Sequence, residues 1–238
     1  MKLGILEADQ LDKAIQDQYG SYSEMFQELF SAVDDQLVFQ SYDIVHLEYP
    51  DSMAACDAYL ITGSKASTYE DKPWIRRLEN EVHALHTRRK KLIGICFGHQ
   101  LIAQALGGKV QKSEEGWGVG MASRRVFLEK SWMGKMEDSY RILVSHQDQV
   151  TQLPPGAELI AGNEFCPHAS FQMGRHILSF QGHPEFQPNY LRQLIAGRRE
   201  IIGPLRADQA LKSLEKKTDH LQIARWIVAF LKSPIGNL

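Results

Sequence analysis

Cys96 lies where a strand-like segment meets a helix-like one, and its neighbours are suited to make the thiol reactive. The apolar run 91–96 leads directly into 97–106, and Gly94 and Gly98 flank the cysteine at two residues on either side. Small residues there permit a sharp strand-to-helix turn that lifts a nucleophile above a sheet. The N-terminus of the following helix directs N–H groups at the sulfur and favours thiolate. The pattern predicts a nucleophile; the alternative is a buried structural cysteine.

A thiol nucleophile needs a base, and the base needs a group that orients it. The segment 177–185 supplies both, because a strand-like run ends in His183-Pro184-Glu185. We expect His183 to exchange protons with Cys96, and Glu185 to fix the tautomer of the imidazole and stabilise the imidazolium. The triplet alone fits a surface turn equally well. Together with Cys96 it predicts a catalytic triad.

Acyl transfer also needs N–H donors for a tetrahedral oxyanion. The amide of Phe97, directly after the nucleophile, is one expected donor. The second is expected in the small-residue loop 63–67, beginning at Gly63, although this loop also fits a surface turn. The carboxyl ends of parallel strands gather at one edge of a sheet, so Gly63, Cys96 and His183 are expected to meet there.

Short apolar runs alternate with amphipathic segments of helical length through the first half of the chain, which is typical of βαβ units. Strand-like runs follow from residue 109 to about 180, and helical patterns return after 185. The predicted fold class is α/β: a three-layer sandwich with a central, mostly parallel sheet flanked by helices, a small added β section and C-terminal helices. We expect one domain over 1–238, with a catalytic core at about 1–186 and a helical extension at about 187–238.

The last helical segment, 221–232, is apolar over more than one stripe and is expected to pack on its own domain or on a partner. The basic run 88–91 is expected to be a solvated helix end. His83 and His86 are spaced i, i+3 on a helical segment, but no third ligand lies nearby in sequence, so no metal site is expected.

Composition narrows the classes of protein. The 238 residues are 43% hydrophobic, and 27 basic residues face 29 acidic ones for a formal net charge of −2. The hydrophobic content disfavours disorder, and the balance of charges gives no indication of a nucleic-acid-binding surface. No leader or membrane span is expected, and the protein is expected to be cytoplasmic. The three cysteines are an odd number without CxxC spacing, which disfavours disulfides and zinc.

Four motifs in order resemble those of the class I, triad-type glutamine amidotransferases, most closely stand-alone relatives of the glutaminase domain of GMP synthase. They are Gly63-Ser64, the segment 94–100, Ser145-His146-Gln147-Asp148 and the segment 182–185. The resemblance implies a flavodoxin-like core, a γ-glutamyl thioester on Cys96 and an oxyanion held by the amides of Gly63 and Phe97. It also implies that Gln100, Ser145 and His146 hold the amino and carboxylate ends of the substrate.

Thr62-Gly63-Ser64 and the segment 70–74 look more like the γ-glutamyl peptidase branch of that family. Two enzymes therefore stay open: a glutaminase that passes ammonia to a synthetase partner, and a γ-glutamyl hydrolase that acts alone. No ATP-pyrophosphatase segment is recognised, so GMP synthesis by this chain alone is not expected, and no cofactor is implied. Two rivals are a partner-binding module on the same fold and a cysteine peptidase or chaperone-like protein with a similar turn. The sequence leaves the oligomeric state open.

Overall fold

The computed structural model describes residues 1–134 and 138–236. Three helices in these ranges begin at a proline, which suits the first helical position. The bounds are α1 (Lys13–Tyr19), α2 (Tyr22–Ser31), α3 (Pro73–Thr87), α4 (Phe97–Ala105), α5 (Pro188–Gly197), α6 (Arg199–Ile202), α7 (Pro204–Ser213) and α8 (His220–Lys232). Short 3₁₀ turns lie at Ile44–His46 and Ser131–Met133. The N-terminus of α2 carries a capping box, in which Ser21 and Glu24 satisfy each other's backbone amides.

A nine-stranded sheet runs through the molecule in the order β2-β1-β3-β4-β11-β10-β9-β6-β7. Its strands are β1 (Lys2–Glu7), β2 (Val38–Asp43), β3 (Ala58–Ile61), β4 (Lys91–Ile95), β6 (Gly118–Val126), β7 (Ser139–His146), β9 (Ala157–Gly162), β10 (Ser170–Met173) and β11 (Ile177–Phe180). The first five in this order are parallel, and the other four extend the sheet antiparallel. A separate ribbon pairs β5 (Lys109–Lys112) with β8 (Asp148–Gln152).

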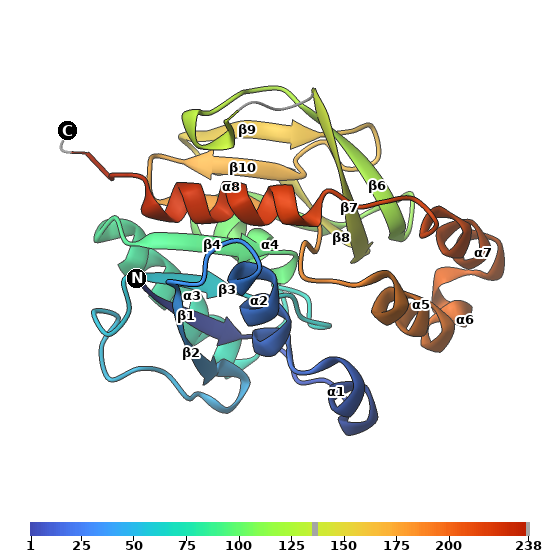
Figure 1. Cartoon of the computed structure of the whole chain (residues 1–238), viewed down its shortest axis with the longest axis horizontal. Coiled ribbons are helices and arrows are strands. Elements are labelled where there is room, and N and C mark those ends of the chain that lie inside the picture. Colours follow the sequence, from blue (N-terminus) through green and yellow to red (C-terminus); the bar gives the residue numbers. More distant parts are fainter. Residues whose placement is uncertain (135–137, 237–238) are drawn as a thin grey trace.

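Helices cover both faces of the parallel strands, which gives the three layers that the sequence predicts (Figure 1). One hydrophobic cluster joins α2 and α8 to the inner face of β1, β3, β4 and β11, with Phe26, Ile93 and Ile227 fully buried. A second cluster joins α3 and α4 to the opposite face, with Leu78 and Leu101 fully buried. Alternate residues of each strand therefore face different helices, as the period of two in a strand requires.

Helix α8 packs on its own sheet. Trp226 is 2% exposed and donates from Nε1 to the carbonyl oxygen of Met133 at 2.8 Å. Helices α5 to α7 lie beside the β6–β7 hairpin instead (Figure 1), and Tyr190 and Ala207 belong to a third apolar cluster there. No helix in the described ranges has both the length and the apolar character needed to cross a membrane.

The structure departs from the sequence expectations in places. Lys91, expected in a solvated helix end, is 4% exposed and begins β4; its Nζ donates to the carbonyl oxygens of Arg175 and Phe230 at 2.7 and 2.6 Å. Elements α1, α6, β5, β8 and β10 have no counterpart in the sequence prediction. They are short, and α1 buries no residue, so none leaves a long hydrophobic period.

Candidate active site

The backbone turns sharply at Cys96, between β4 and α4. Its φ and ψ are 51° and −98°, a left-handed conformation that L-residues avoid and that persists only where the surroundings enforce it. A Cβ added to Gly94 would lie 2.7 Å from the backbone of Gly98, and one added to Gly98 would lie 2.4 Å from the carbonyl oxygen of Ile61. The two glycines are therefore needed for strand, turn and helix to approach this closely.

His183 and Glu185 form a buried pair beside the turn. The Nδ1 atom of His183 lies 2.7 Å from Oε1 of Glu185, and the two side chains are 4% and 0% exposed. Burial acts to lower the pKa of His183, but the charges of Glu185 and Cys96 and hydrogen bonds to both outweigh it and raise that pKa. Because Nδ1 faces Glu185, Nε2 is left for the sulfur of Cys96.

Contacts of its backbone and of its ring hold His183 in place. Its backbone amide donates to the carbonyl oxygen of Leu143 at 2.8 Å, which ties the end of β11 to β7. Phe186 stacks on the imidazole with ring centroids 3.8 Å apart and planes 9° apart, and Tyr190 packs edge-on against Phe186. The orientation of the imidazole is therefore set by packing as well as by Glu185.

The loop after β3 touches this group. A Cβ on Gly63 would lie 2.7 Å from Cε1 of His183 and 3.6 Å from Cβ of Cys96. Two bonds fix the loop's start: Ala8 N donates to Thr62 Oγ1 at 2.9 Å, and Gly98 N donates to the carbonyl oxygen of Thr62 at 3.2 Å. The amide of Phe97, first in α4, has no acceptor within its helix.

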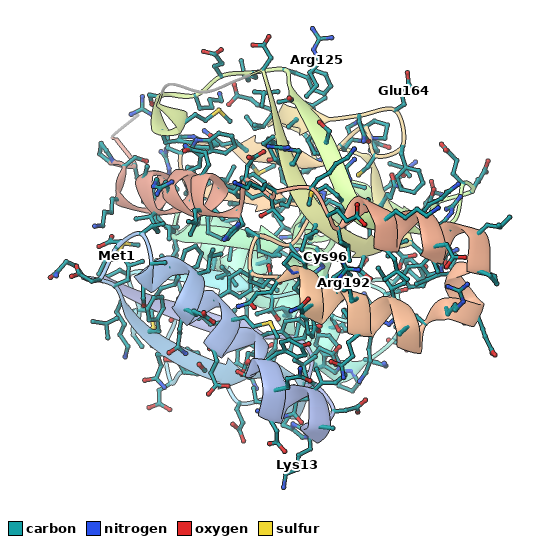
Figure 2. All side chains as sticks on the ribbon, turned by 45° about the vertical axis from the view of Figure 1, so that its right-hand side comes forward. Met1, Lys13, Cys96, Arg125, Glu164 and Arg192 are labelled. Atoms are coloured by element: carbon teal, nitrogen blue, oxygen red, sulfur yellow. The ribbon has the colours of Figure 1, made fainter. Side chains whose placement is uncertain are left out.

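A pocket of about 390 Å³ opens over the sulfur. Among the predicted substrate-binding residues, Gln100, Ser145 and His146 line it together with Cys96. The amide nitrogen of Gln100 donates to the carbonyl oxygen of Asp148 at 2.7 Å, and this bond holds α4 against the loop after β7. Gly63, Phe97, His183 and Glu185 lie outside the lining, as does Phe186. Figure 2 shows Cys96 near the middle of the view.

Two histidines near the sulfur, His146 and His99, are buried and uncharged. Burial lowers the pKa of His146 to about 3 and that of His99 to about 3 as well. The ring of His99 bonds through Nδ1 to Ser179 Oγ at 2.8 Å and lies against Phe171, so it packs beneath the site and does not line it. The ring of His146 bonds through Nδ1 to the carbonyl oxygen of Asp148.

The sequence analysis missed several residues around the sulfur. The side-chain nitrogen of Gln181 lies 3.5 Å from Sγ of Cys96, and its oxygen accepts from Gln100. The sequence feature that could have indicated Gln181 is its place two residues before His183, at the end of the same strand-like run. Lys112, Trp117 and Arg198 also line the pocket; they come from separate parts of the chain and carry no motif.

Within residues 1–134 and 138–236, no group of three His, Cys, Asp or Glu side chains is arranged to hold a metal ion. Nδ1 of His86 lies 3.0 Å from Nε2 of His176. His83, three residues before His86, takes no part in that contact.

A reactive-thiol geometry at the carboxyl edge of a parallel sheet, with an imidazole and a carboxylate beside it, defines an α/β protein of the nucleophile-elbow class with cysteine at the elbow. The chain belongs to the glutamine amidotransferase class-I family, whose model matches residues 14–196. This finding confirms the family that the four motifs indicate.

Curated relatives carry three kinds of description. A glutamine amidotransferase-like protein of Schizosaccharomyces pombe is 32% identical over 96% of this chain and 98% of its own. Gamma-glutamyl peptidase 3 of Arabidopsis thaliana is 31% identical over 74% of each chain. A glutamine-hydrolysing GMP synthase of Cupriavidus taiwanensis is 36% identical over 76% of this chain but only 32% of its own.

Solved structures share the fold. A glutamine amidotransferase of Thermotoga maritima matches with a TM-score of 0.78 at 18% identity, over 97% of this chain and 99% of that one. A glutamine amidotransferase of Methylobacillus flagellatus matches with a TM-score of 0.70 at 19% identity, over 96% and 94%. The likeness confirms the predicted α/β fold class.

Proposed function

We propose that this protein hydrolyses the γ-amide bond of glutamine or of another γ-glutamyl compound through a thioester on Cys96. The observation that carries the proposal is the placement of Cys96 at a strained turn, beside a loop that touches His183, together with the buried hydrogen-bonded pair of His183 and Glu185. Membership of the class-I family supports the same chemistry. We also propose that residues 1–238 act as one domain, since α8 fills the cluster beneath β4 and β11.

The proposed reaction has two halves. The sulfur of Cys96 attacks the γ-carbonyl carbon, and the amides of Gly63 and Phe97 stabilise the negative charge on its oxygen. His183, protonated and held by Glu185, gives its proton to the leaving nitrogen as the carbon–nitrogen bond breaks. Ammonia or an amine leaves, and the acyl group stays on sulfur as a thioester.

Water completes the cycle. Neutral His183 accepts a proton from water as its oxygen attacks the thioester carbon, and the carbon–sulfur bond then breaks to release glutamate and restore the thiolate–imidazolium pair. Gln181, 3.5 Å from the sulfur, is placed to orient it through these steps. Gln100, Ser145 and His146 are proposed to hold the amino and carboxylate ends of the γ-glutamyl group.

Active-site labelling is the direct test. Iodoacetamide or a glutamine-like diazoketone, followed by mass mapping, is expected to label Cys96, because Cys96 lines the pocket whereas Cys56 and Cys166 are each 1% exposed and do not line it. Labelling at either of those cysteines in the folded protein, with Cys96 unmodified, overturns the assignment. Cys96→Ala is expected to abolish release of glutamate, with Cys56→Ala as the matched control that also deletes a buried thiol.

A second function shares the first half-reaction: a glutaminase that delivers ammonia to a synthetase partner. The match to part of a GMP synthase favours it, whereas the peptidase relatives favour independent hydrolysis. Steady release of glutamate from glutamine by the purified chain supports the glutaminase. Turnover of γ-glutamyl peptides without turnover of glutamine supports the hydrolase.

A further inference from the structure

Arg198 lines the pocket over Cys96 but lies outside the part of the chain that the family model matches. It follows the last residue of α5, and that match ends at residue 196. The family fold therefore brings Cys96 and the loops around it to the sheet edge, while a helix of the C-terminal extension adds a cation to the same 390 Å³ space.

The charge of Arg198 has no carboxylate partner within the described part of the chain. Its Nη1 atom donates a long hydrogen bond to Oγ of Ser145 at 3.5 Å. Another cation of the lining, Lys65, pairs with Asp9 at 3.2 Å. The guanidinium is half-buried, keeps its charge at every pH of interest and presents paired donors that match a carboxylate.

The pocket's own carboxylate does not face Arg198 as an ion-pair partner. The two side-chain oxygens of Asp148 accept hydrogen bonds from Ser67 Oγ at 2.5 Å and from Tyr69 OH at 3.0 Å. Asp148, the first residue of β8, thereby ties the loop after β3 to that strand, and both of its side-chain oxygens are engaged in doing so.

The wall beside Arg198 is both basic and apolar. Lys112, exposed and without an ion-pair partner in the described ranges, belongs to it together with Trp117 and Ile201. Ile201 is 66% exposed, and the carbonyl oxygen of Trp117 accepts from Arg206 at 2.8 Å, which anchors this wall to α7. Such a wall suits a ligand with a short aliphatic chain that ends in an anionic group.

We propose that Arg198, assisted by Lys112, binds a carboxylate on the amine half of the scissile γ-glutamyl amide. This inference rests on the proposed function and narrows its substrate class to γ-glutamyl peptides and related amides of amino acids. Glutamine carries a single α-carboxylate, which the proposed function assigns to Gln100, Ser145 and His146, and its leaving group is ammonia, so it offers no further anion to Arg198. A substrate with a second carboxylate pairs with the guanidinium through two parallel hydrogen bonds.

A matched pair of substrates tests the assignment. γ-Glutamylglycine and γ-glutamylglycinamide have nearly the same size and differ in the terminal charge. Wild-type protein is expected to favour the acid over the amide by about 10- to 100-fold in kcat/KM, the range for a charge-assisted bidentate contact. Arg198→Met is expected to reduce that ratio to about one. Arg192→Met is the control, because it removes a charge from the exposed side of the same helix.

Two results overturn the inference. One is equal use of acid and amide by the wild-type protein. The other is an equal loss for both substrates in Arg198→Met, which means that the guanidinium holds the α-carboxylate that both share. Calorimetric binding of the same pair to Cys96→Ala protein, with and without Arg198→Met, repeats the test without turnover. If wild-type protein cleaves neither these compounds nor glutamine, the proposed function fails, whereas the binding difference still decides the role of Arg198.

Discussion

Replacing Glu185 with glutamine tests how the site divides proton transfer from orientation. The carboxylate oxygen lies 2.7 Å from Nδ1 of His183, and both side chains are buried. Glutamine has nearly the same shape, and its side-chain oxygen still accepts from Nδ1. The substitution therefore removes the charge and keeps the packing around Phe186.

The size of the effect follows from the burial of the pair. Exchanging a charge-assisted hydrogen bond for a neutral one in a site of low dielectric costs about 2 kcal/mol. At 1.36 kcal/mol per pKa unit, this cost lowers the pKa of His183 by about 1.5. If the same amount, about 2 kcal/mol, is lost from the transition state in which the imidazolium protonates the leaving nitrogen, kcat/KM near neutral pH is expected to fall about 30-fold.

Alkylation of Cys96 by iodoacetamide between pH 5 and 10 reads the same change without turnover. The charges of Glu185 and Cys96 raise the pKa of His183 against the effect of burial. Without Glu185 the imidazolium is less stable, the proton returns to the sulfur, and the rise in alkylation rate moves to higher pH. Glu28→Gln, on the exposed side of α2, is the control. Superimposable profiles refute the reasoning, and a variant as inactive as Cys96→Ala contradicts the division of roles.

Three further predictions test the base, the turn and the buried histidines. His183→Asn is expected to lower kcat by several orders of magnitude, since loss of one triad member removes the proton transfer; a loss below tenfold contradicts this role. Gly98→Ala places a Cβ 2.4 Å from a carbonyl oxygen of β3 and should lower the free energy of unfolding by about 3 kcal/mol in urea, whereas Gly197→Ala, with open space around its Cβ, should not. Burial lowers the pKa of His99 to about 3 and that of His146 to about 3, so below pH 6.5 the unfolded state binds more protons than the folded one. Urea titrations should therefore show stability falling on acidification, by up to about 1.4 kcal/mol per pH unit for each histidine.

The chemistry at the sulfur was accessible from the sequence because it depends on neighbours along the chain. Glycines two residues on either side of Cys96 indicate a tight backbone turn. In the structure, a Cβ atom added at these glycines would lie 2.7 and 2.4 Å from neighbouring backbone atoms. His183 and Glu185 are separated by one residue, so the 2.7 Å contact between them is local as well. The parallel order of the strands follows from the alternation of apolar runs and helices.

The walls of the pocket depended on contacts between distant segments. Arg198 and Ser145 meet across 53 positions, and Gln181 reaches Cys96 across 85. No period or motif specifies such pairs, because they arise from the way α5 lies against β7 and β11 ends beside β4. The short ribbon of β5 and β8 was missed for the same reason.

Burial of charge was also decided by tertiary structure. The run 88–91 has the composition of a solvated helix end, yet Lys91 donates to the carbonyl oxygens of Arg175 and Phe230. The packing of α8 and of the connection between β10 and β11 makes these acceptors available. The sequence by itself determined which family the chain belongs to, and it predicted which atom is the nucleophile and which groups serve it. The tertiary structure alone decided which charges reach the pocket, because substrate contacts depend on side chains that several elements bring together from separate parts of the chain.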